Sequence, residues 1–212
     1  FGGIVGYNAG LIGDCSFNGT IRTSGGLDYN DSGSDVGAIG GICGINEQGT
    51  VRGCTVDGNI TLALDDAGWK VGGICGYARG NTLLEDCINN AAVSVDITGS
   101  AGNYVSAYVG GICGGCQDVE NYIDHCLNTA SIEARTTIGI TRVGGDCGYS
   151  ATCTDNGNTG ASIHAGYGSK PSYLNSSAYA IIGTGYTTSN TILYDSEHGT
   201  RSASEGNALK IR

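Results

Sequence analysis

Val-Gly-Gly-Ile-Cys-Gly at residues 71–76 is one of five copies of a single short pattern in this chain. Each copy places an apolar residue before two glycines, then Ile, then Val or Cys, then Gly. The other copies begin at residues 1, 39, 109 and 143, and the last has Asp146 where the others have Ile. Self-similarity at such intervals is typical of proteins built from stacked repeats. The repeat therefore decides the fold before any local propensity is considered.

A second cysteine follows in the same phase of every copy, and an alternating segment comes after it. Residues 60–64 (Ile-Thr-Leu-Ala-Leu) and 93–97 (Val-Ser-Val-Asp-Ile) are clear examples of period-two alternation. This period indicates a strand with one face buried. The second cysteines are Cys15, Cys54, Cys87, Cys126 and Cys153.

Three short strands cannot bury their apolar faces alone, but stacked copies pair each strand with its own counterpart and form a continuous core. The sequence thus predicts an all-β fold, a β-solenoid resembling a parallel β-helix, over residues 1–165. A sandwich with Gly-Gly corners is the alternative, and five in-phase copies disfavour it. The predicted repeats lie near 1–38, 39–70, 71–108, 109–142 and 143–165. Residues 166–212 contain no cysteine and are predicted to cap the last repeat.

Ten cysteines, an even number, favour disulfides made in an oxidising compartment. Four bonds can join the later cysteine of one repeat to the cysteine in the Gly-Gly segment of the next repeat. The two cysteines that remain, Cys116 and Cys153, then pair with each other, although other connectivities are open. A zinc site is disfavoured because only Cys113 and Cys116 have the C-x-x-C spacing, with no second pair and no neighbouring histidine pair. The predicted bonds are Cys15–Cys43, Cys54–Cys75, Cys87–Cys113, Cys126–Cys147 and Cys116–Cys153.

The charge of the chain excludes two classes of partner. Its formal net charge is −10, and its 10 Lys and Arg residues are scattered. A nucleic-acid binder needs a basic stripe, and an acidic surface repels anionic lipid headgroups. The sequence also holds no apolar run near the length of a membrane-spanning helix. We therefore predict neither nucleic-acid binding nor membrane insertion.

Residues that carry catalysis are not evident. The three histidines are His125, His164 and His198, and His125 lies between an Asp and a cysteine predicted to be bonded. Asp65-Asp66 is an adjacent carboxylate pair of the kind that polysaccharide hydrolysis could use, but it falls in a variable segment. We predict no catalytic residue and no required cofactor.

Calcium is the one metal that the sequence suggests. Asp28, Asn30 and Ser32 place oxygen ligands at alternate positions before Gly33, as in a calcium loop. Ile39 stands where the closing Glu of such a loop belongs. A solvated polar loop is therefore favoured over a calcium site.

Length differences between the repeats concentrate after the third strand of each copy, and insertions at one phase of a solenoid project from one side. These segments contain aromatic rings and carboxylates, which suit the apolar faces and hydroxyls of sugars. The alternative is that the rings only pack their own loops. The predicted binding residues are Tyr29, Trp69, Tyr104, Tyr108, Asp65 and Asp66.

The repeat unit resembles a known family. Residues 2–10 (Gly-Gly-Ile-Val-Gly-Tyr-Asn-Ala-Gly), followed by Asp14-Cys15, are similar to the GLUG repeat of bacterial surface proteins, which include large adhesins and some immunoglobulin A peptidases. Residues 73–77 and 86–87 match as well, and residues 192–196 resemble the segment that often closes such arrays. The resemblance implies a secreted or surface location and a β-solenoid, and it carries no catalytic residues.

These observations favour a non-catalytic extracellular or cell-surface module for adhesion or ligand presentation, with a glycan or a host or cell-surface protein as partner. A structural subunit that self-associates end to end into a filament is the alternative. A polysaccharide-active β-helix enzyme is the third candidate.

Overall fold

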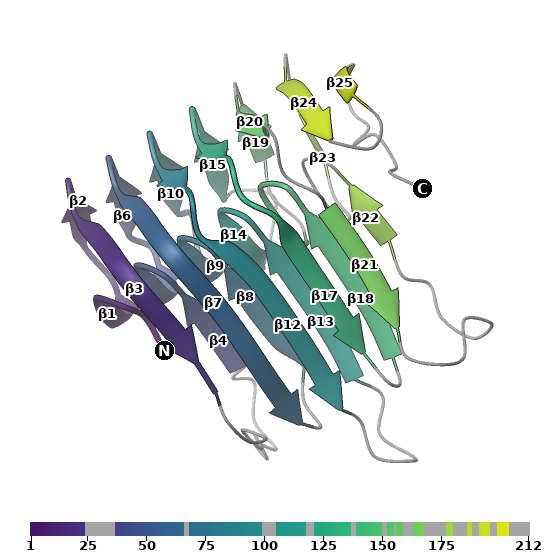
Figure 1. Cartoon of the computed structure of the whole chain (residues 1–212). Coiled ribbons are helices and arrows are strands. Elements are labelled where there is room, and N and C mark those ends of the chain that lie inside the picture. The colour runs from purple at the N-terminus through teal and green to yellow at the C-terminus, as the bar shows by residue number, and fades with distance from the viewer. Residues whose placement is uncertain are drawn as a thin grey trace.

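In the residues that the computed structural model describes, every secondary-structure element is a strand (Figure 1). None of its described segments is a helix able to cross a membrane. It describes residues 1–23, 37–65, 68–98, 105–117, 121–136, 139–149, 152–154, 156–158, 163–167, 177–179, 186–187, 191–195 and 199–203.

The strands form four open sheets, and each sheet runs in the order of the repeats (Figure 1). The first sheet holds β1 (Val5–Asn8), β5 (Cys43–Glu47), β9 (Cys75–Arg79) and β14 (Cys113–Cys116). The second holds β2 (Leu11–Gly13), β6 (Thr50–Arg52), β10 (Leu83–Glu85), β15 (Tyr122–Asp124), β19 (Thr152–Thr154) and β23 (Tyr186–Thr187).

The other two sheets carry the alternating segments and the strands that precede each Gly-Gly pair. The third holds β3 (Ser16–Arg22), β7 (Thr55–Asp65), β11 (Ile88–Asn89), β12 (Ala92–Thr98), β16 (Leu127–Asn128), β17 (Ile132–Thr136), β20 (Gly157–Asn158), β21 (Ile163–Tyr167), β24 (Thr191–Asp195) and β25 (Gly199–Ala203). The fourth holds β4 (Gly37–Gly40), β8 (Trp69–Gly72), β13 (Val105–Gly110), β18 (Gly139–Gly144) and β22 (Ser177–Tyr179).

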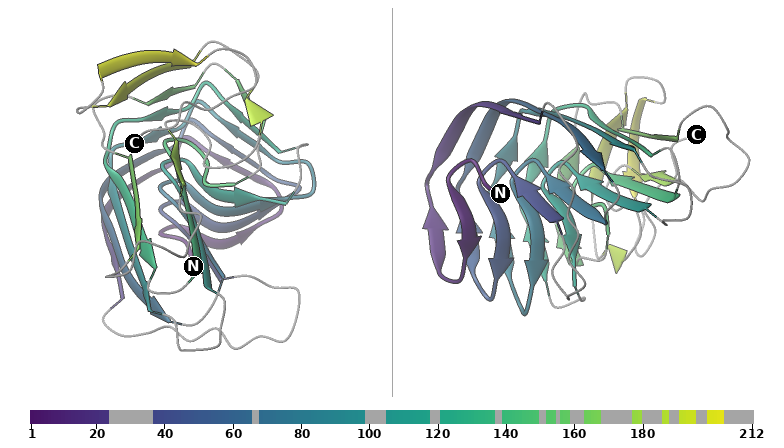
Figure 2. Two further views of the ribbon diagram at one scale, coloured as in Figure 1. Left: turned by 90° about the vertical axis from the view of Figure 1, so that its right-hand side faces the viewer. Right: turned by 90° about the horizontal axis from the view of Figure 1, so that it is seen from below.

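Each strand pairs in parallel with its counterpart in the next repeat. Cys75 pairs with Cys43 on one side and Cys113 on the other, so equivalent residues lie side by side. Figure 2 shows the strands of successive repeats one behind another. The prediction of an all-β chain is confirmed, and the pairing is parallel throughout the described strands except between β24 and β25. The predicted C-terminal segment contributes β22, β23 and β24, which extend three of these sheets.

Two apolar cores lie between the sheets. The first core contains residues of the Gly-Gly turns, of the first and second sheets and of the start of the third, such as Ile74 and Leu84. The second core contains inward side chains of the third and fourth sheets, such as Leu62 and Val71. All four of these side chains are at most 2% exposed. Because every repeat contributes equivalent residues, each core continues from one repeat to the next.

The Gly-Gly pair is required by the close approach of backbones at the turn between the fourth and first sheets. A Cβ added at Gly72 would lie 1.9 Å from the carbonyl oxygen of Cys75 in the same turn. A Cβ at Gly73 would lie 2.1 Å from the carbonyl oxygen of Gly111 in the next repeat. Real Cβ atoms do not approach backbone oxygens so closely, so only glycine fits at both positions.

This packing predicts the effect of a single methyl group. We expect Gly73→Ala to lower the free energy of unfolding by about 1–3 kcal/mol, as overpacking of a close contact does. Gly13→Ala is the matched control, because a Cβ at Gly13 meets nothing within 4 Å. Urea unfolding measures both variants. Equal effects would show that backbone approach does not explain the Gly-Gly pair.

The predicted disulfides are not present. The nine cysteines whose side chains the structure describes are all free thiols, and the side chain of Cys153 lies outside this set. The thiol of Cys54 interacts with that of Cys87, and the thiol of Cys75 with those of Cys43 and Cys113, its partners in neighbouring strands. The offset pairing is not seen, because in-register stacking places each cysteine beside its own copy.

Candidate functional site

Trp69 is not an exposed binding platform, which corrects the sequence prediction. Its side chain is 3% exposed and belongs to the second core. Trp69 is in register with Gly37 and Ala107, so both neighbouring repeats leave room for the indole. A Cβ at Gly37 would lie 2.4 Å from the Trp69 ring. These two small residues at the same phase were the sequence signal that the ring is buried.

The remaining predicted binding residues do not form one described group. Asp65 ends β7 half-buried, and its carbonyl oxygen accepts a hydrogen bond from Nε1 of Trp69 at 3.5 Å. Tyr108 is half-buried on β13. Tyr29, Tyr104 and Asp66, with the calcium candidates Asp28, Asn30 and Ser32, lie outside the described residues.

Tyr108 instead belongs to a cluster of three tyrosines and two cations, which we call the aromatic–cationic cluster. The rings of Tyr108 and Tyr149 have centroids 5.0 Å apart. Cζ of Arg142 lies 5.4 Å from the Tyr108 centroid and 5.2 Å from that of Tyr149. Nζ of Lys70 lies 4.1 Å from the Tyr77 centroid and 5.8 Å from that of Tyr108. Cations at these distances are attracted by the negative faces of the rings.

Strand register assembles this cluster. Lys70, Tyr108 and Arg142 are directly paired positions of β8, β13 and β18. They alternate with the buried Trp69 and Val71, so they take the opposite face of the fourth sheet. The sequence indicated Tyr108 but not its partners, because the two cations occupy aligned positions of different repeats with no shared residue type.

Lys70 and Arg142 differ in their exposure. Arg142 and Tyr149 are half-buried, whereas Lys70 is only 9% exposed. Burial lowers the pKa of Lys70 to about 8, although interaction with the thiols of Cys113 and Cys116 acts in the opposite direction. Arg142 is thus the more accessible cation of the cluster, and it stands on a chain whose net charge is −10.

A second group, which we call the thiol cluster, lies in the first core and consists of Cys113, Cys116 and Cys147. Their three Sγ atoms all lie within 4.8 Å of one another, and those of Cys113 and Cys116 are 3.9 Å apart. All three side chains are at most 1% exposed. Burial raises the pKa of the Cys113 thiol, but interactions with the thiols of Cys116, Cys147 and Cys75 bring that pKa well below its ordinary value.

Residues 35–61 match the GLUG motif. The chain contains a GLUG repeat. Within the matched segment lie β4, β5, β6 and the first half of β7, which belong to all four sheets. No curated protein and no solved structure is significantly similar to the chain.

The turn at Asp124-His125-Cys126 has counterparts in other repeats, including the one matched by the GLUG motif. The matched repeat has Arg52-Gly53-Cys54 at the same phase, and Gly53 and His125 both adopt positive φ, 63° and 50°. Asp14 and Asp86 do the same in other repeats, with φ of 53° and 54°. His125 therefore occupies a turn position that recurs in four repeats, at residues 14, 53, 86 and 125.

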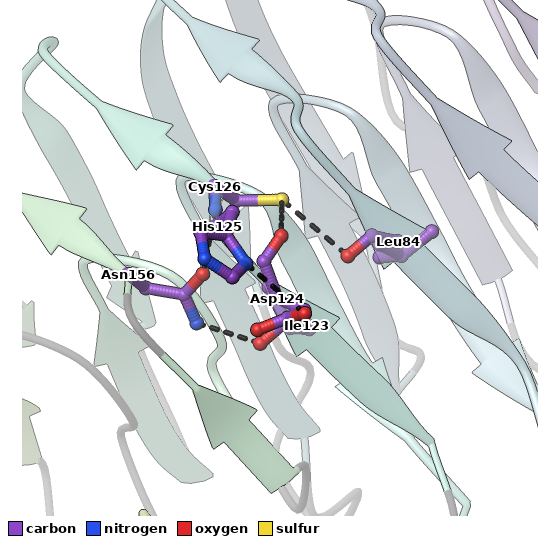
Figure 3. Close-up of polar contacts among 6 residues, drawn as sticks. All are labelled: Leu84, Ile123, Asp124, His125, Cys126 and Asn156. Atoms are coloured by element: carbon purple, nitrogen blue, oxygen red, sulfur yellow. Dashed lines mark hydrogen bonds and ion pairs between the residues drawn. The ribbon is translucent and has the colours of Figure 1, made fainter. Parts of the chain in front are cut away.

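Figure 3 shows the surroundings of this turn. Nδ1 of His125 lies 3.1 Å from Oδ2 of Asp124, and the histidine side chain is 57% exposed. The Cys126 thiol is 1% exposed and donates to the carbonyl oxygens of Asp124 and Leu84 at 3.4 and 3.5 Å. A substrate has no access to a sulfur buried in this way. The side chains of His164 and His198 lie outside the described residues.

Proposed function

We propose that residues 1–165 form a β-solenoid that serves as a non-catalytic extracellular or cell-surface module, and that the aromatic–cationic cluster binds an acidic glycan. In-register parallel pairing of successive repeats in four sheets supports the solenoid. The GLUG motif at residues 35–61 supports the surface location, because this repeat is similar to those of bacterial surface proteins.

The placement of Arg142 over two adjacent tyrosine rings carries the choice of ligand. The rings of Tyr108 and Tyr149 offer flat apolar surfaces on which a sugar ring stacks. The guanidinium group of Arg142 has donors arranged to match a carboxylate. A sugar that bears a carboxylate satisfies both requirements, whereas a neutral sugar uses only the rings.

The cluster replaces the binding face predicted from the variable loops. Trp69 is excluded because it is buried, and Tyr108 is retained because its half-buried ring contacts Arg142. Since paired strands advance by about 4.8 Å per repeat, the residues of β8, β13 and β18 extend over about 10 Å. That length corresponds to a few sugar units rather than a long polymer.

We expect Arg142→Gln to weaken binding of polygalacturonate about tenfold or more. A hydrogen bond to a charged group contributes about 1.5–3 kcal/mol, and about 1.4 kcal/mol corresponds to a tenfold change in affinity. Isothermal titration calorimetry with the whole chain measures the effect, and added salt should weaken binding by the wild-type protein.

Arg135→Gln is the matched control for this experiment. Arg135 is an exposed arginine on β17 of the third sheet, where it pairs with Glu133. It should leave the affinity unchanged, and neutral dextran should not bind. Equal losses in the two variants would indicate unspecific charge attraction, and failure of the wild type to bind polygalacturonate would refute the acidic-glycan proposal.

A further inference from the structure

The thiol cluster draws its sulfurs from two repeats. Cys113 and Cys116 begin and end β14, and Cys147 forms an isolated parallel bridge with Cys113. The C-x-x-C segment alone offers two ligands, and strand register brings the third. The sequence disfavoured a metal because no second C-x-x-C pair lies near Cys113 and Cys116, whereas the third sulfur comes from the residue paired with Cys113 in the next repeat.

The distances in the cluster suit one shared ion. Two sulfurs bound to a tetrahedral zinc ion at about 2.3 Å each lie about 3.8 Å apart. Sγ of Cys113 and Sγ of Cys116 are 3.9 Å apart, and the third sulfur is within 4.8 Å of both. A disulfide requires about 2.05 Å between its sulfurs. The observed spacing thus corresponds to thiolates around an ion rather than to a bonded pair.

Cys116 has no counterpart in the repeats before it. The position paired with Cys116 in β9 is Ala78, and the position paired with Ala78 in β5 is Asn46. The ladder of Cys43, Cys75, Cys113 and Cys147, in contrast, follows the repeat. Packing of the repeats therefore does not require a cysteine at position 116, and the presence of Cys116 beside Cys113 and Cys147 needs another explanation.

Lys70 supplies the charge that such a site needs. Its side chain crosses the Cys113–Cys116 segment, where a Cβ at Gly115 would lie 3.2 Å from Lys70 Cδ. Three thiolates around a divalent ion carry a net charge of −1, and a buried charge is costly unless an opposite charge lies nearby. The ammonium group of Lys70 interacts with Cys113 and Cys116 and offsets that charge.

We propose that Cys113, Cys116 and Cys147 bind a thiophilic metal ion of the Zn²⁺ class inside the first core. Three thiols each release a proton to solvent as three metal–sulfur bonds form, and no electron is transferred. Soft thiolate ligands select such ions over Ca²⁺ or Mg²⁺, which prefer oxygen. The ion would join two successive repeats, a role that the predicted disulfides do not fill here.

Titration of the whole chain with Co²⁺, a spectroscopic substitute for Zn²⁺, tests the proposal. Thiolate ligation should produce charge-transfer bands in the near ultraviolet that saturate at one ion per chain, and added Zn²⁺ should remove them. Zn²⁺ should also raise the melting temperature of the wild-type protein, because the ion binds the folded state.

Cys116→Ala should abolish the Co²⁺ bands and the thermal shift, whereas Cys126→Ala should retain both. Cys126 is the matched control, being a cysteine equally buried in the same core but outside the cluster. If Cys116→Ala fails to fold, resistance of the three wild-type thiols to alkylation until a chelator is added provides the second measurement. A Cys113–Cys116 or Cys113–Cys147 disulfide in the native protein would overturn the proposal. So would an equal loss of the Co²⁺ bands in Cys116→Ala and Cys126→Ala.

Discussion

Trp69→Ala should lower the free energy of unfolding by about 3–5 kcal/mol, the usual effect of truncating a buried tryptophan. The indole is 3% exposed and fills space above Gly37, beside Ala107. Neither small neighbour has a side chain long enough to occupy the resulting cavity. Trp69→Phe should have a smaller effect because part of the ring volume remains.

Leu11→Ala provides the comparison for Trp69→Ala. Leu11 is a large apolar residue at the start of β2, but its side chain is 68% exposed. Its truncation should change the free energy of unfolding by about 0.5 kcal/mol or less. Chemical denaturation of both variants measures the difference, and a loss below about 1 kcal/mol for Trp69→Ala would contradict the burial described above.

Asp146→Ile should raise the free energy of unfolding by about 2–4 kcal/mol. Asp146 is fully buried at the position that Ile42, Ile74 and Ile112 take in other repeats, and neither carboxyl oxygen has a hydrogen-bond partner among the described residues. The substitution removes an unsatisfied buried group, which costs about 1–3 kcal/mol, and adds buried apolar surface. Asp96→Ile, at an exposed position of β12, is the control and should have little effect.

The stabilisation by Asp146→Ile should depend on pH. Burial raises the pKa of Asp146 well above its ordinary value, so the folded state holds a proton that the unfolded state releases above about pH 4. Stability of the wild-type protein therefore falls as pH rises from there toward the folded-state pKa. Unfolding measured with a chelator present should show that Asp146→Ile raises the free energy of unfolding more at pH 7 than at pH 4. An equal increase at the two pH values would mean that the carboxyl is not buried.

Strand pairing could be predicted because the repeats share one apolar pattern. A register shift of one residue would turn the inward side chains outward, so identical patterns such as those of β7 and β12 pair in phase. Individual side chains of short strands were harder to assign. Trp69 begins a strand of four residues next to a variable segment, and only its register with Gly37 and Ala107 determines which face it takes.

The same distinction applies to the cysteines. Their even number favoured disulfides, but connectivity depends on distances in space that sequence phase does not supply. In-register stacking placed Cys54 beside Cys87 and brought Cys147 to the C-x-x-C pair, and it likewise joined Lys70, Tyr108 and Arg142.

The sequence by itself determined the repeat and the all-β parallel pairing, because the periodic burial of strands is a local property copied in every unit. Only the tertiary structure decided which side chains meet between repeats. Those contacts depend on the register of strands tens of residues apart and on the face of the sheet that each residue takes. Residues that are not repeated, such as Cys116, Arg142 and Asp146, have no periodic pattern from which their register or their face could be predicted.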